Sequence, residues 1–467
     1  MKKDVQLDEN GQPKFGLIDK VAYAAGDLGC NLSFGLKGTV QTFWLAYMTL
    51  ETGLLSILLL LVQIWDAVND PIIGAVIDAD KRRYKRGKFK TYIFIGAIGL
   101  IFGGAAVFLP FPNASTFVKA MLFIVGYVIW DAAYTVANVP YGAMLSLITK
   151  DAGERAQLST WRSIGSLIGS LLPNTILPIL IWKNVYDGDG QLLGQELKGT
   201  SVFIAALIMG VIAFFAFLFM LRNTTLRVDE YSVKTGEDAP NFNIFTAFGN
   251  FMKNRPAVGA TIAAMGLFLG IQSAATATAI MFATYFKNAQ LSGVVMLIGF
   301  LPMFLFMPFV KKIVNRFGKK ESATAGSLVC VAGGLVMLAF PMVPQSSALP
   351  VYMTGALLFG LGLGVYTCVN WALVADAIDY SEWKTNKREE GMVYSLHSFF
   401  RKLAQGVGPS IVIALLGALG YVSELGTTGQ SPEVAHRACW LVAGLYLFSA
   451  VMQFVGIGVI FNLDRKT

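Results

Sequence analysis

The sequence predicts an all-α membrane protein with twelve transmembrane helices, arranged as two pseudo-symmetric halves of six. Three observations lead to this prediction. The 467 residues are 55% hydrophobic and 14% charged, with a mean hydropathy of +0.59, whereas soluble chains are about 25% charged. Twelve segments are long and apolar enough to cross a bilayer, which takes about 20 mostly apolar residues. One polar stretch, residues 222–255, leaves six of these segments before it and six after it.

The twelve predicted spans follow one another with short connections. They cover residues 18–48, 53–77, 91–110, 117–148, 158–182, 201–221, 257–286, 291–310, 322–343, 349–376, 391–421 and 435–461. The expected organisation is a cytoplasmic tail (1–16), an N-terminal bundle (17–222), a cytoplasmic central loop (223–255), a C-terminal bundle (256–461) and a cytoplasmic tail (462–467). The tail at 1–16 is polar and lacks the apolar core of a cleavable signal peptide, so the first span would itself direct insertion.

The short loops predict the orientation of the spans. "DADKRRYKRGKFK" after the second span and "KKIVNRFGKK" after the eighth are rich in Lys and Arg, whereas "ETG", "FPNAS" and "VPQSS" contain neither. Basic loops stay on the cytoplasmic side, so we expect both termini to lie on the cytoplasmic side of the membrane. The expected location is a bacterial-type plasma (inner) membrane. Each basic loop follows the second span of its own half and contains Gly-Lys. This indicates an internal repeat of the kind found in secondary transporters, although any twelve-helix protein has basic cytoplasmic loops.

The second span carries two acids in its middle, in "QIWDAVNDPIIG" at residues 63–74. A charged residue at the centre of a span costs about 2.5–3.5 kcal/mol on insertion scales, so it usually faces a cavity or a partner. Asp66 and Asp70 are four residues apart and share one helix face, with Asn69 beside them. Two carboxylates and an amide suit Na⁺ or a shared proton. The alternative is that one Asp pairs with a lysine for structural reasons alone.

The first span contains a second polar pair, Asp27 and Asn31, again four residues apart. We expect both to contribute to a substrate site, where Asn31 would meet sugar hydroxyls. Equally, Asn31 could hydrogen-bond a neighbouring helix, as intramembrane Asn often does. Lys37, further along the same span, is expected to pair with an acid of the bundle.

The fourth span places polar and aromatic side chains together. Asp131, Thr135 and Asn138 lie on one stripe, and Trp130 and Tyr134 accompany them. Aromatic faces stack on the C–H faces of a sugar while neighbouring polar groups bond its hydroxyls, so Trp130, Tyr134 and Asn138 are substrate candidates. For Trp130, an aromatic packing role is an equal alternative.

Cationic side chains occur inside two further spans. Arg162 lies in the fifth span, and the eleventh span pairs Ser398 with Lys402 and His397 with Arg401 at a spacing of four. Arg162, Ser398 and Arg401 are substrate candidates. A buried lysine needs an anion, and the acids of the second span would supply it, so Lys402 is expected to couple the cation site to the substrate.

An acidic loop at the end of the tenth span contains Asp376, Asp379 and Glu382. We expect it to meet the basic cytoplasmic loops as a gate latch, with Arg388 as a further gating residue. Simple solvation of these charges is the alternative.

Other classes of function find little support. The four cysteines form no C-x-x-C pair and there are only two histidines, so neither a disulfide framework nor a metal site is expected, apart from a possible Na⁺ site. Motifs such as H-E-x-x-H and G-x-S-x-G are missing from the sequence. We therefore expect no enzyme, no cofactor and no nucleic-acid partner.

These residues resemble a known family, the glycoside–pentoside–hexuronide:cation symporters of the major facilitator superfamily, which includes the melibiose and glucuronide permeases. The stretches that carry the likeness are "GDLGCNLSFG" (26–35), "IWDAVNDPIIG" (64–74), "RGKFK" (86–90), "YTVANVPYG" (134–142), "VADAIDYSEWKTNKREEGMVYS" (374–395) and "SFFRKLAQGVG" (398–408). The resemblance implies the major facilitator fold and a monomer.

The resemblance also implies roles for single residues. Residues matching Asp66, Asn69, Asp70 and Thr135 surround the coupling cation in melibiose-type members, and the residue matching Lys402 lies beside them. Arg162 is similar to the family's substrate-site arginine.

Three positions depart from the melibiose pattern, because Asn31, Asn138 and Gly142 stand where those members have Asp, Asp and Trp. These departures argue against galactoside recognition of that type and favour H⁺ relative to Na⁺. A pocket with fewer acids that still contains Arg162 and Arg401 would accept an acidic substrate.

The expected function is secondary active transport, in which H⁺ or Na⁺ influx drives uptake of a small sugar or glycoside, with a hexuronide as one candidate. The alternatives are a lysolipid-type carrier of the same superfamily and, least favoured, a polytopic membrane enzyme.

Overall fold

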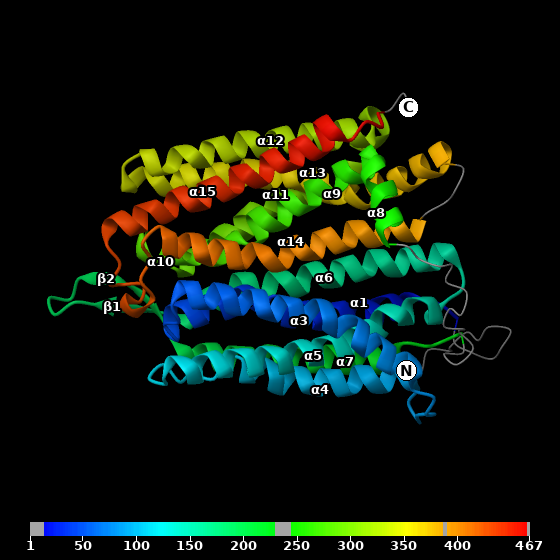
Figure 1. The fold of residues 1–467 in the computed structure, drawn as a ribbon, viewed down its shortest axis with the longest axis horizontal. Coiled ribbons are helices and arrows are strands. Elements are labelled where there is room, and N and C mark those ends of the chain that lie inside the picture. The colour runs from blue at the N-terminus through cyan, green and yellow to red at the C-terminus, as the bar shows by residue number, and fades with distance from the viewer. Residues whose placement is uncertain (1–13, 229–243, 386–389, 465–467) are drawn as a thin grey trace, which may run out of the picture. The chain divides into compact units, whose positions relative to one another are not determined.

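The computed structural model describes residues 14–228, 244–385 and 390–464, and long helices dominate it (Figure 1). The chain divides into two compact units. Unit 1 contains residues 1–50, 61–183 and 197–238, and unit 2 contains residues 51–60, 184–196 and 239–467.

Unit 1 holds the helices of the first part of the chain. They are α1 (Leu17–Phe34), α2 (Leu36–Thr42), the short π-helix η1 (Phe43–Tyr47), α3 (Thr52–Ala79, of which residues 52–60 are grouped with unit 2), α4 (Lys88–Ala106), α5 (Thr116–Ile148), α6 (Ala152–Ile181) and α7 (Gly199–Asn223). Within this unit α1 packs against α6 and α7, and α4 packs against α5 and α7.

Unit 2 holds the helices of the second part. They are α8 (Ile244–Lys253), α9 (Arg255–Leu267), η2 (Phe268–Gln272), α10 (Ala274–Thr284), α11 (Gln290–Phe317), α12 (Lys319–Ala339), η3 (Phe340–Met342), α13 (Gln345–Thr385), α14 (Glu390–Ala418), η4 (Ser423–Leu425), α15 (Pro432–Phe454) and η5 (Val455–Ile460). Here α13 packs against α11 and α12, and α15 packs against α9 and α12.

The predicted spans coincide with helical structure. Ten helices of the described residues are long and apolar enough to cross a membrane. Of the two other predicted spans, 18–48 is built from α1, α2 and η1, and 291–310 lies within α11. The prediction of a helical, multi-pass membrane fold is thus confirmed.

Three local features were not predicted. A two-stranded sheet, β1 (Trp182–Tyr186) and β2 (Leu192–Leu197), fills the connection between α6 and α7, so the described fold is not purely helical. Helix α8 lies within the stretch expected to be a loop. The acidic segment with Asp376 and Asp379 is not a loop either, because α13 continues through it to Thr385.

Glycines allow α6 to approach α1 closely. A Cβ atom on Gly165 would lie 2.1 Å from the carbonyl oxygen of Ala24, and one on Gly169 would lie 2.7 Å from that of Leu28. Any larger side chain would push the helices apart. Gly165 and Gly169 are four residues apart and therefore lie on the same face of α6.

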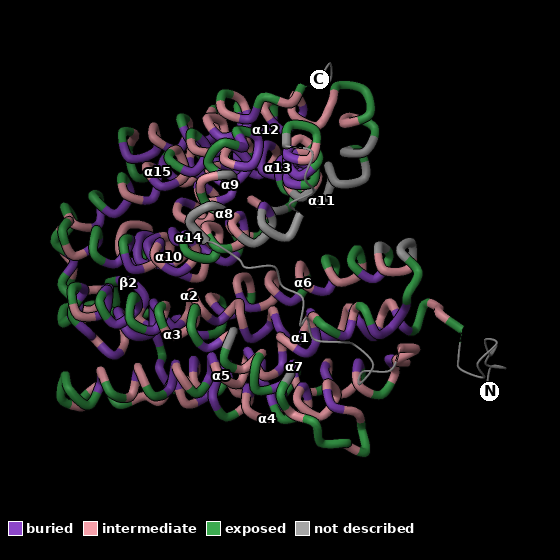
Figure 2. The backbone as a smooth tube through the Cα atoms, turned by 45° about the vertical axis from the view of Figure 1, so that its right-hand side comes forward, coloured by how far each residue is buried: buried purple, intermediate pink, exposed green. Residues whose placement is uncertain are grey.

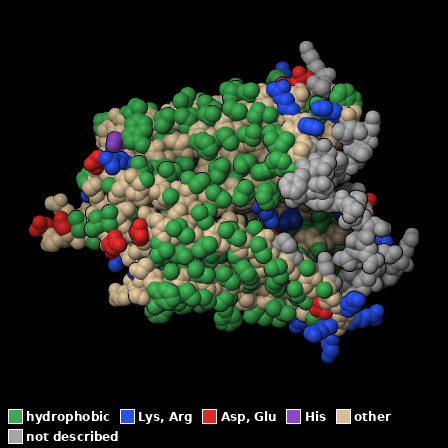
Figure 3. Space-filling model, viewed as in Figure 1, with side chains coloured by type: hydrophobic (Ala, Val, Ile, Leu, Met, Phe, Trp, Pro, Cys, Tyr) green, Lys and Arg blue, Asp and Glu red, His purple; other side chains and the backbone are tan. Residues whose placement is uncertain are grey.

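Exposed apolar side chains mark one face of α3. Ile64, Val68, Ile72 and Val76 are about half exposed and recur at a spacing of four. On the side drawn in Figure 3, hydrophobic side chains cover the middle of the helices, and most visible Lys and Arg side chains lie near helix ends. Buried and exposed residues alternate along single helices (Figure 2). This pattern is typical of helices whose outer face meets lipid.

The two basic loops share a backbone feature. Gly87 (φ 87°, ψ 155°) directly precedes α4, and Gly318 (φ 103°, ψ 160°) directly precedes α12. A positive φ favours glycine because it has no Cβ. The Gly-Lys dipeptides that indicated an internal repeat therefore adopt the same conformation before the third span of each half.

Asp80 orders the first basic loop. It accepts hydrogen bonds from the Tyr84 hydroxyl (2.6 Å), the Tyr92 hydroxyl (2.8 Å) and the backbone N–H of Arg82 (2.9 Å). These bonds lower the pKa of the Asp80 carboxyl to about 2, and the bond from Tyr84 has the largest effect. Asp80 therefore stays ionised at every physiological pH.

Candidate functional site

The acids of α3 lie away from its exposed apolar stripe. Asp66 and Asp70 are partly buried and Asn69 is almost fully buried. Asp66 follows Ile64 by two residues, which places it roughly opposite that residue on the helix. The face they occupy is turned towards α5 and α2, as their contacts show.

Asn69 and Thr135 connect α3 to α5. The Asn69 amide nitrogen donates to the Thr135 hydroxyl (2.9 Å) and to the Asp131 carboxylate (3.3 Å), and the Thr135 hydroxyl donates to Asp70 (2.9 Å). Both bonds of Asn69 use its NH₂ group, so its amide oxygen takes part in neither. Three of the four residues predicted to bind a cation are thus hydrogen-bonded in one network.

The fourth predicted cation ligand, Asp66, joins this network through Asp131. The two carboxyl groups interact electrostatically. Gln63, one turn earlier on α3, donates to Asp66 Oδ2 (3.2 Å). Asp131 is only 2% exposed, so the group gathers acids in a place where unpaired charge is expensive.

Lys37 supplies a positive charge to these acids. Its Nζ lies 3.6 Å from Asp66 Oδ2 and 4.6 Å from the centre of the Phe34 ring. Tyr127 and Asp131 on α5 also interact electrostatically with it. The expectation that Lys37 pairs with an acid of the bundle is confirmed.

Arg162 and Asp27 form a second polar group in unit 1. Arg162 Nε lies 2.9 Å from Asp27 Oδ1, and the Asn31 amide donates to Asp27 Oδ2 (3.0 Å). Ser170 in turn donates to the Asn31 amide oxygen (3.2 Å). The Asp27 side chain is 6% exposed and that of Arg162 is 37% exposed. Asp27 therefore contacts the guanidinium through Nε, and the Arg162 side chain as a whole remains partly exposed.

Aromatic rings border this second group. The Arg162 guanidinium lies 5.2 Å from the centre of the Tyr141 ring. The Tyr134 ring, 5.9 Å from that of Phe34, is partly exposed, as is Asn138. Trp130 differs, because it is 2% exposed and its indole N–H donates to Ser33 (2.8 Å). The structure thus places Trp130 in helix packing, the alternative considered for it from the sequence.

The predicted residues of the eleventh span lie on α14 in unit 2. Ser398 and Arg401 are partly buried and Lys402 is exposed. The Arg401 guanidinium lies 5.3 Å from the centre of the Phe268 ring. His397 is buried, and its Nδ1 lies 2.9 Å from the Thr261 hydroxyl. The substrate and coupling roles of these residues stay predictions.

The predicted gate involves a contact within unit 2. Asp376 on α13 forms an ion pair with Lys319 (2.5 Å), which belongs to the second basic loop in the sequence. Asp379 lies one turn further along α13. Arg388 lies outside the described residues. A latch between the acidic segment and a basic loop remains a prediction.

Sequence reasoning missed three contributors to these groups. Asp131 was placed on the right stripe of α5 but given no role, although its spacing of four from Thr135 could have assigned it. Gln63 carries a similar signal, because it precedes Asp66 by three residues on α3. Ser170 comes from a different helix than Asn31, and nothing in its local sequence points to that contact.

The same acids do not form a compact metal centre. Among the residues the structure describes, no three Asp, Glu, His or Cys side chains converge as ligands of one metal ion. Cys30, Cys330, Cys368 and Cys439 are free thiols.

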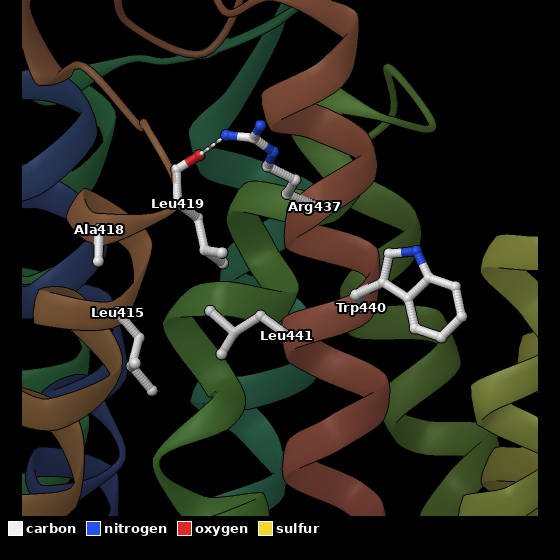
Figure 4. Close-up of a pocket in the computed structure, with 6 residues that line it drawn as sticks. All are labelled: Leu415, Ala418, Leu419, Arg437, Trp440 and Leu441. Atoms are coloured by element: carbon white, nitrogen blue, oxygen red, sulfur yellow. Dashed lines mark hydrogen bonds between the residues drawn. The ribbon is translucent and has the colours of Figure 1, made fainter.

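A cavity of about 300 Å³ lies elsewhere, between α14 and α15 of unit 2 (Figure 4). It is lined by Leu415, Ala418, Leu419, Arg437, Trp440 and Leu441. Arg437 already donates to the Leu419 carbonyl (3.2 Å). A sugar needs several convergent polar groups, so the polar groups of unit 1 are the better candidate site.

Comparison with known proteins identifies the family. Residues 22–465 match the family model described as "MFS/sugar transport protein". The chain is 30% identical to "Uncharacterized symporter YjmB" of Bacillus subtilis (strain 168) over 90% of this chain and 87% of that protein. It is 27% identical to "Glucuronide carrier protein homolog" of Escherichia coli (strain K12), over 89% and 86% of the two chains.

A solved structure shares the fold. The crystal structure of a D-xylose-proton symporter superposes with a TM-score of 0.59 at 16% identity, over 94% of this chain and 96% of that chain. At this identity the likeness concerns the fold alone. Together with the family match, it makes the chain a transporter and not an enzyme: it is a multi-pass membrane protein that belongs to the MFS/sugar transport protein family of the major facilitator superfamily.

Proposed function

We propose that this chain is a symporter of the bacterial plasma (inner) membrane that couples H⁺ or Na⁺ influx to uptake of a small glycoside with an acidic group, such as a hexuronide. Transport follows an alternating-access cycle, and both termini lie in the cytoplasm. The protein acts as a monomer without a cofactor. Its two bundles, residues 17–222 and 256–461, move about the substrate.

One observation carries the choice of an acidic substrate. Asp27 contacts Arg162 through Nε, and the Arg162 side chain is 37% exposed; in this proposal its two terminal nitrogens form a fork that faces the substrate. A guanidinium fork matches a carboxylate in bidentate geometry. Asn31 and Asn138, amides in place of acids, add no negative charge that would repel such a group. The likeness to a glucuronide carrier homolog supports the same substrate class.

The cation role falls to Asp66, Asn69, Asp70 and Thr135, with Lys402 linking the cation site to the substrate. The hydrogen-bonded network of three of these residues supports this assignment. Two carboxylates with an amide and a hydroxyl offer oxygen atoms, which hard cations prefer, and a carboxylate can instead take up a proton. Substrate contacts would come from Arg162, Tyr134, Asn138 and, in unit 2, Ser398 and Arg401.

A lysolipid-type carrier is the less favoured function. A lipid chain needs a wide apolar surface, whereas the polar residues of the two groups described above come from five helices of unit 1 (α1, α2, α3, α5 and α6).

Uptake into proteoliposomes tests the proposal. A labelled aryl glucuronide and its neutral glucoside are compared, first under a pH gradient and then under a Na⁺ gradient. We expect concentrative uptake of the glucuronide under one of the gradients and little uptake of the glucoside. Equal or better uptake of the glucoside would remove the acidic-substrate assignment.

A further inference from the structure

Lys37 stands inside the group of acids proposed to bind the coupling ion, although that proposal gives it no role. It lies in the first turn of α2, in the middle of the first predicted span. Its Nζ is 3.6 Å from Asp66 Oδ2, and both side chains are 24% exposed. A lysine at this depth is costly unless it is paired, and its partner here is a predicted cation ligand.

The local chain geometry holds the ammonium in this position. The first span changes from α1 to α2 at Gly35, whose Cβ, if present, would lie 2.3 Å from Pro173 Cγ on α6. The backbone of this segment is therefore pressed against α6. The Phe34 ring supports Nζ at 4.6 Å, so aromatic packing and an ion pair fix the same atom.

The charged and titratable groups facing Lys37 come from two helices. Asp66 faces it from α3, and Tyr127 and Asp131 face it from α5. Oδ2 of Asp66 also accepts a hydrogen bond from Gln63. The oxygen that would otherwise ligate a cation thus already faces two protein donors.

We propose that the Lys37 ammonium is a tethered cation that takes the place of Na⁺ among these acids, so that the carrier does not bind Na⁺ and the proton is its coupling ion. This inference rests on the proposed transport function, and it narrows the coupling ion from two candidates to one.

Electrostatics sets the expected size of the effect. A Na⁺ ion bound to Asp66 Oδ2 would lie within about 6 Å of Nζ, because Nζ is itself 3.6 Å from that oxygen. At an effective dielectric constant of about 20, two like charges at that distance repel enough to weaken binding roughly a hundredfold. Removing the lysine charge should strengthen Na⁺ binding by about this factor.

Equilibrium binding of ²²Na⁺ to the purified protein tests the inference without a substrate. We expect no saturable binding to the wild type and saturable binding to Lys37→Met. Lys37→Arg keeps the charge and should behave as the wild type. Lys119→Met is the matched control, because Lys119 is also a buried lysine of unit 1, but its Nζ donates to Thr49 (3.2 Å). It should gain no Na⁺ binding.

Several results would overturn the inference. Saturable Na⁺ binding to the wild type is sufficient alone, and it needs no variant to fold. The inference is also overturned if neither Lys37→Met nor the more polar Lys37→Gln gains Na⁺ binding although both elute as folded monomers. An equal gain of Na⁺ binding in Lys37→Arg or Lys119→Met would overturn it too, since the charge at position 37 would then not be the cause.

A second measurement separates this inference from the proposed function. Counterflow of a labelled aryl glucuronide in wild-type proteoliposomes reports transport without an ion gradient. If the wild type shows both counterflow and saturable Na⁺ binding, the proposed role of Lys37 is wrong and the proposed transport function stands. If the wild type shows neither counterflow of any glycoside tested nor Na⁺ binding, the proposed function is wrong and the electrostatic inference stands.

Discussion

Replacing Asp27 with asparagine tests whether the Arg162 guanidinium is held in place for an acidic substrate. Asp27 accepts from Arg162 on Oδ1 (2.9 Å) and from Asn31 on Oδ2 (3.0 Å). An asparagine has the same shape but only one acceptor oxygen, and it carries no charge. One of the two donors therefore loses its bond to this side chain, although Asn31 keeps its bond to the Asp27 backbone carbonyl (2.9 Å), and the guanidinium loses its counter-ion.

The magnitude follows from the two losses. A buried donor left without a partner costs about 1–3 kcal/mol. The ion pair would be worth about 4 kcal/mol at 4 Å with an effective dielectric constant of about 20. The Arg162 side chain is 37% exposed, so solvent screening reduces that figure to about 1 kcal/mol. The sum, about 2–4 kcal/mol, corresponds to a rise in KM of roughly 30- to 900-fold if substrate binding needs the ordered fork.

The assay is counterflow of a labelled aryl glucuronide in proteoliposomes, measured over a range of concentrations. Asp19→Asn is the matched control. Asp19 is another buried acid of α1 paired with an arginine, Arg227 (3.0 Å), and it lies outside the candidate site. Breaking this buried pair should cost about 3–5 kcal/mol, so the control should lower the Tm in detergent and leave KM unchanged.

Two results would refute the reasoning. An unchanged KM in Asp27→Asn would show that the ordered guanidinium does not contribute to substrate binding. A rise in KM of the same size in Asp19→Asn would show that loss of any buried acid on α1 has this effect, so that the site itself is not the cause.

Three further predictions concern other parts of the chain. Asp70→Asn removes the carboxylate that Thr135 donates to, so concentrative uptake should be lost while counterflow persists; full concentrative uptake would contradict the cation assignment. Gly165→Ala places a Cβ 2.1 Å from the Ala24 carbonyl, and overpacking of this kind costs about 1–3 kcal/mol, seen as a lower Tm; an unchanged Tm would show that α1 and α6 separate without cost. Because its folded pKa of about 2 lies below the ordinary value, Asp80 stabilises the first basic loop above about pH 4 and loses this effect as the pH falls through about 2. Asp80→Asn should therefore speed cleavage of this loop by trypsin at neutral pH, and an unchanged rate would contradict the ordering role.

Much of the fold could be predicted from the sequence, because a bilayer imposes a simple rule on a chain. Each crossing needs about 20 apolar residues in a helix that satisfies its own backbone. The predicted spans therefore coincide with helices. The β1–β2 hairpin and α8 were missed because both lie in connections, where this rule does not apply. The extension of α13 through Asp376 was missed because a polar surface does not prevent a helix from continuing beyond the bilayer.

The candidate site was predicted where its residues lie near one another in sequence. The i,i+4 spacing of Asp66 and Asp70 placed them on one face of α3, and the stripe of Asp131 and Thr135 placed these on one face of α5. Contacts between helices were beyond such reasoning. Ser170 meets Asn31 because α6 packs on α1 through Gly165, and no local pattern announces that contact.

The sequence alone determined that the chain crosses a membrane repeatedly and carries charges that a bilayer tolerates only when they are paired, because the cost of burying charge depends on residue type and depth. The tertiary structure decided which charges are partners. Lys37 pairs with Asp66, and Arg162 pairs with Asp27, because helix packing brings together side chains that are distant in the chain. Since an ion pair depends on distances of a few ångströms, only the packed helices could make that choice.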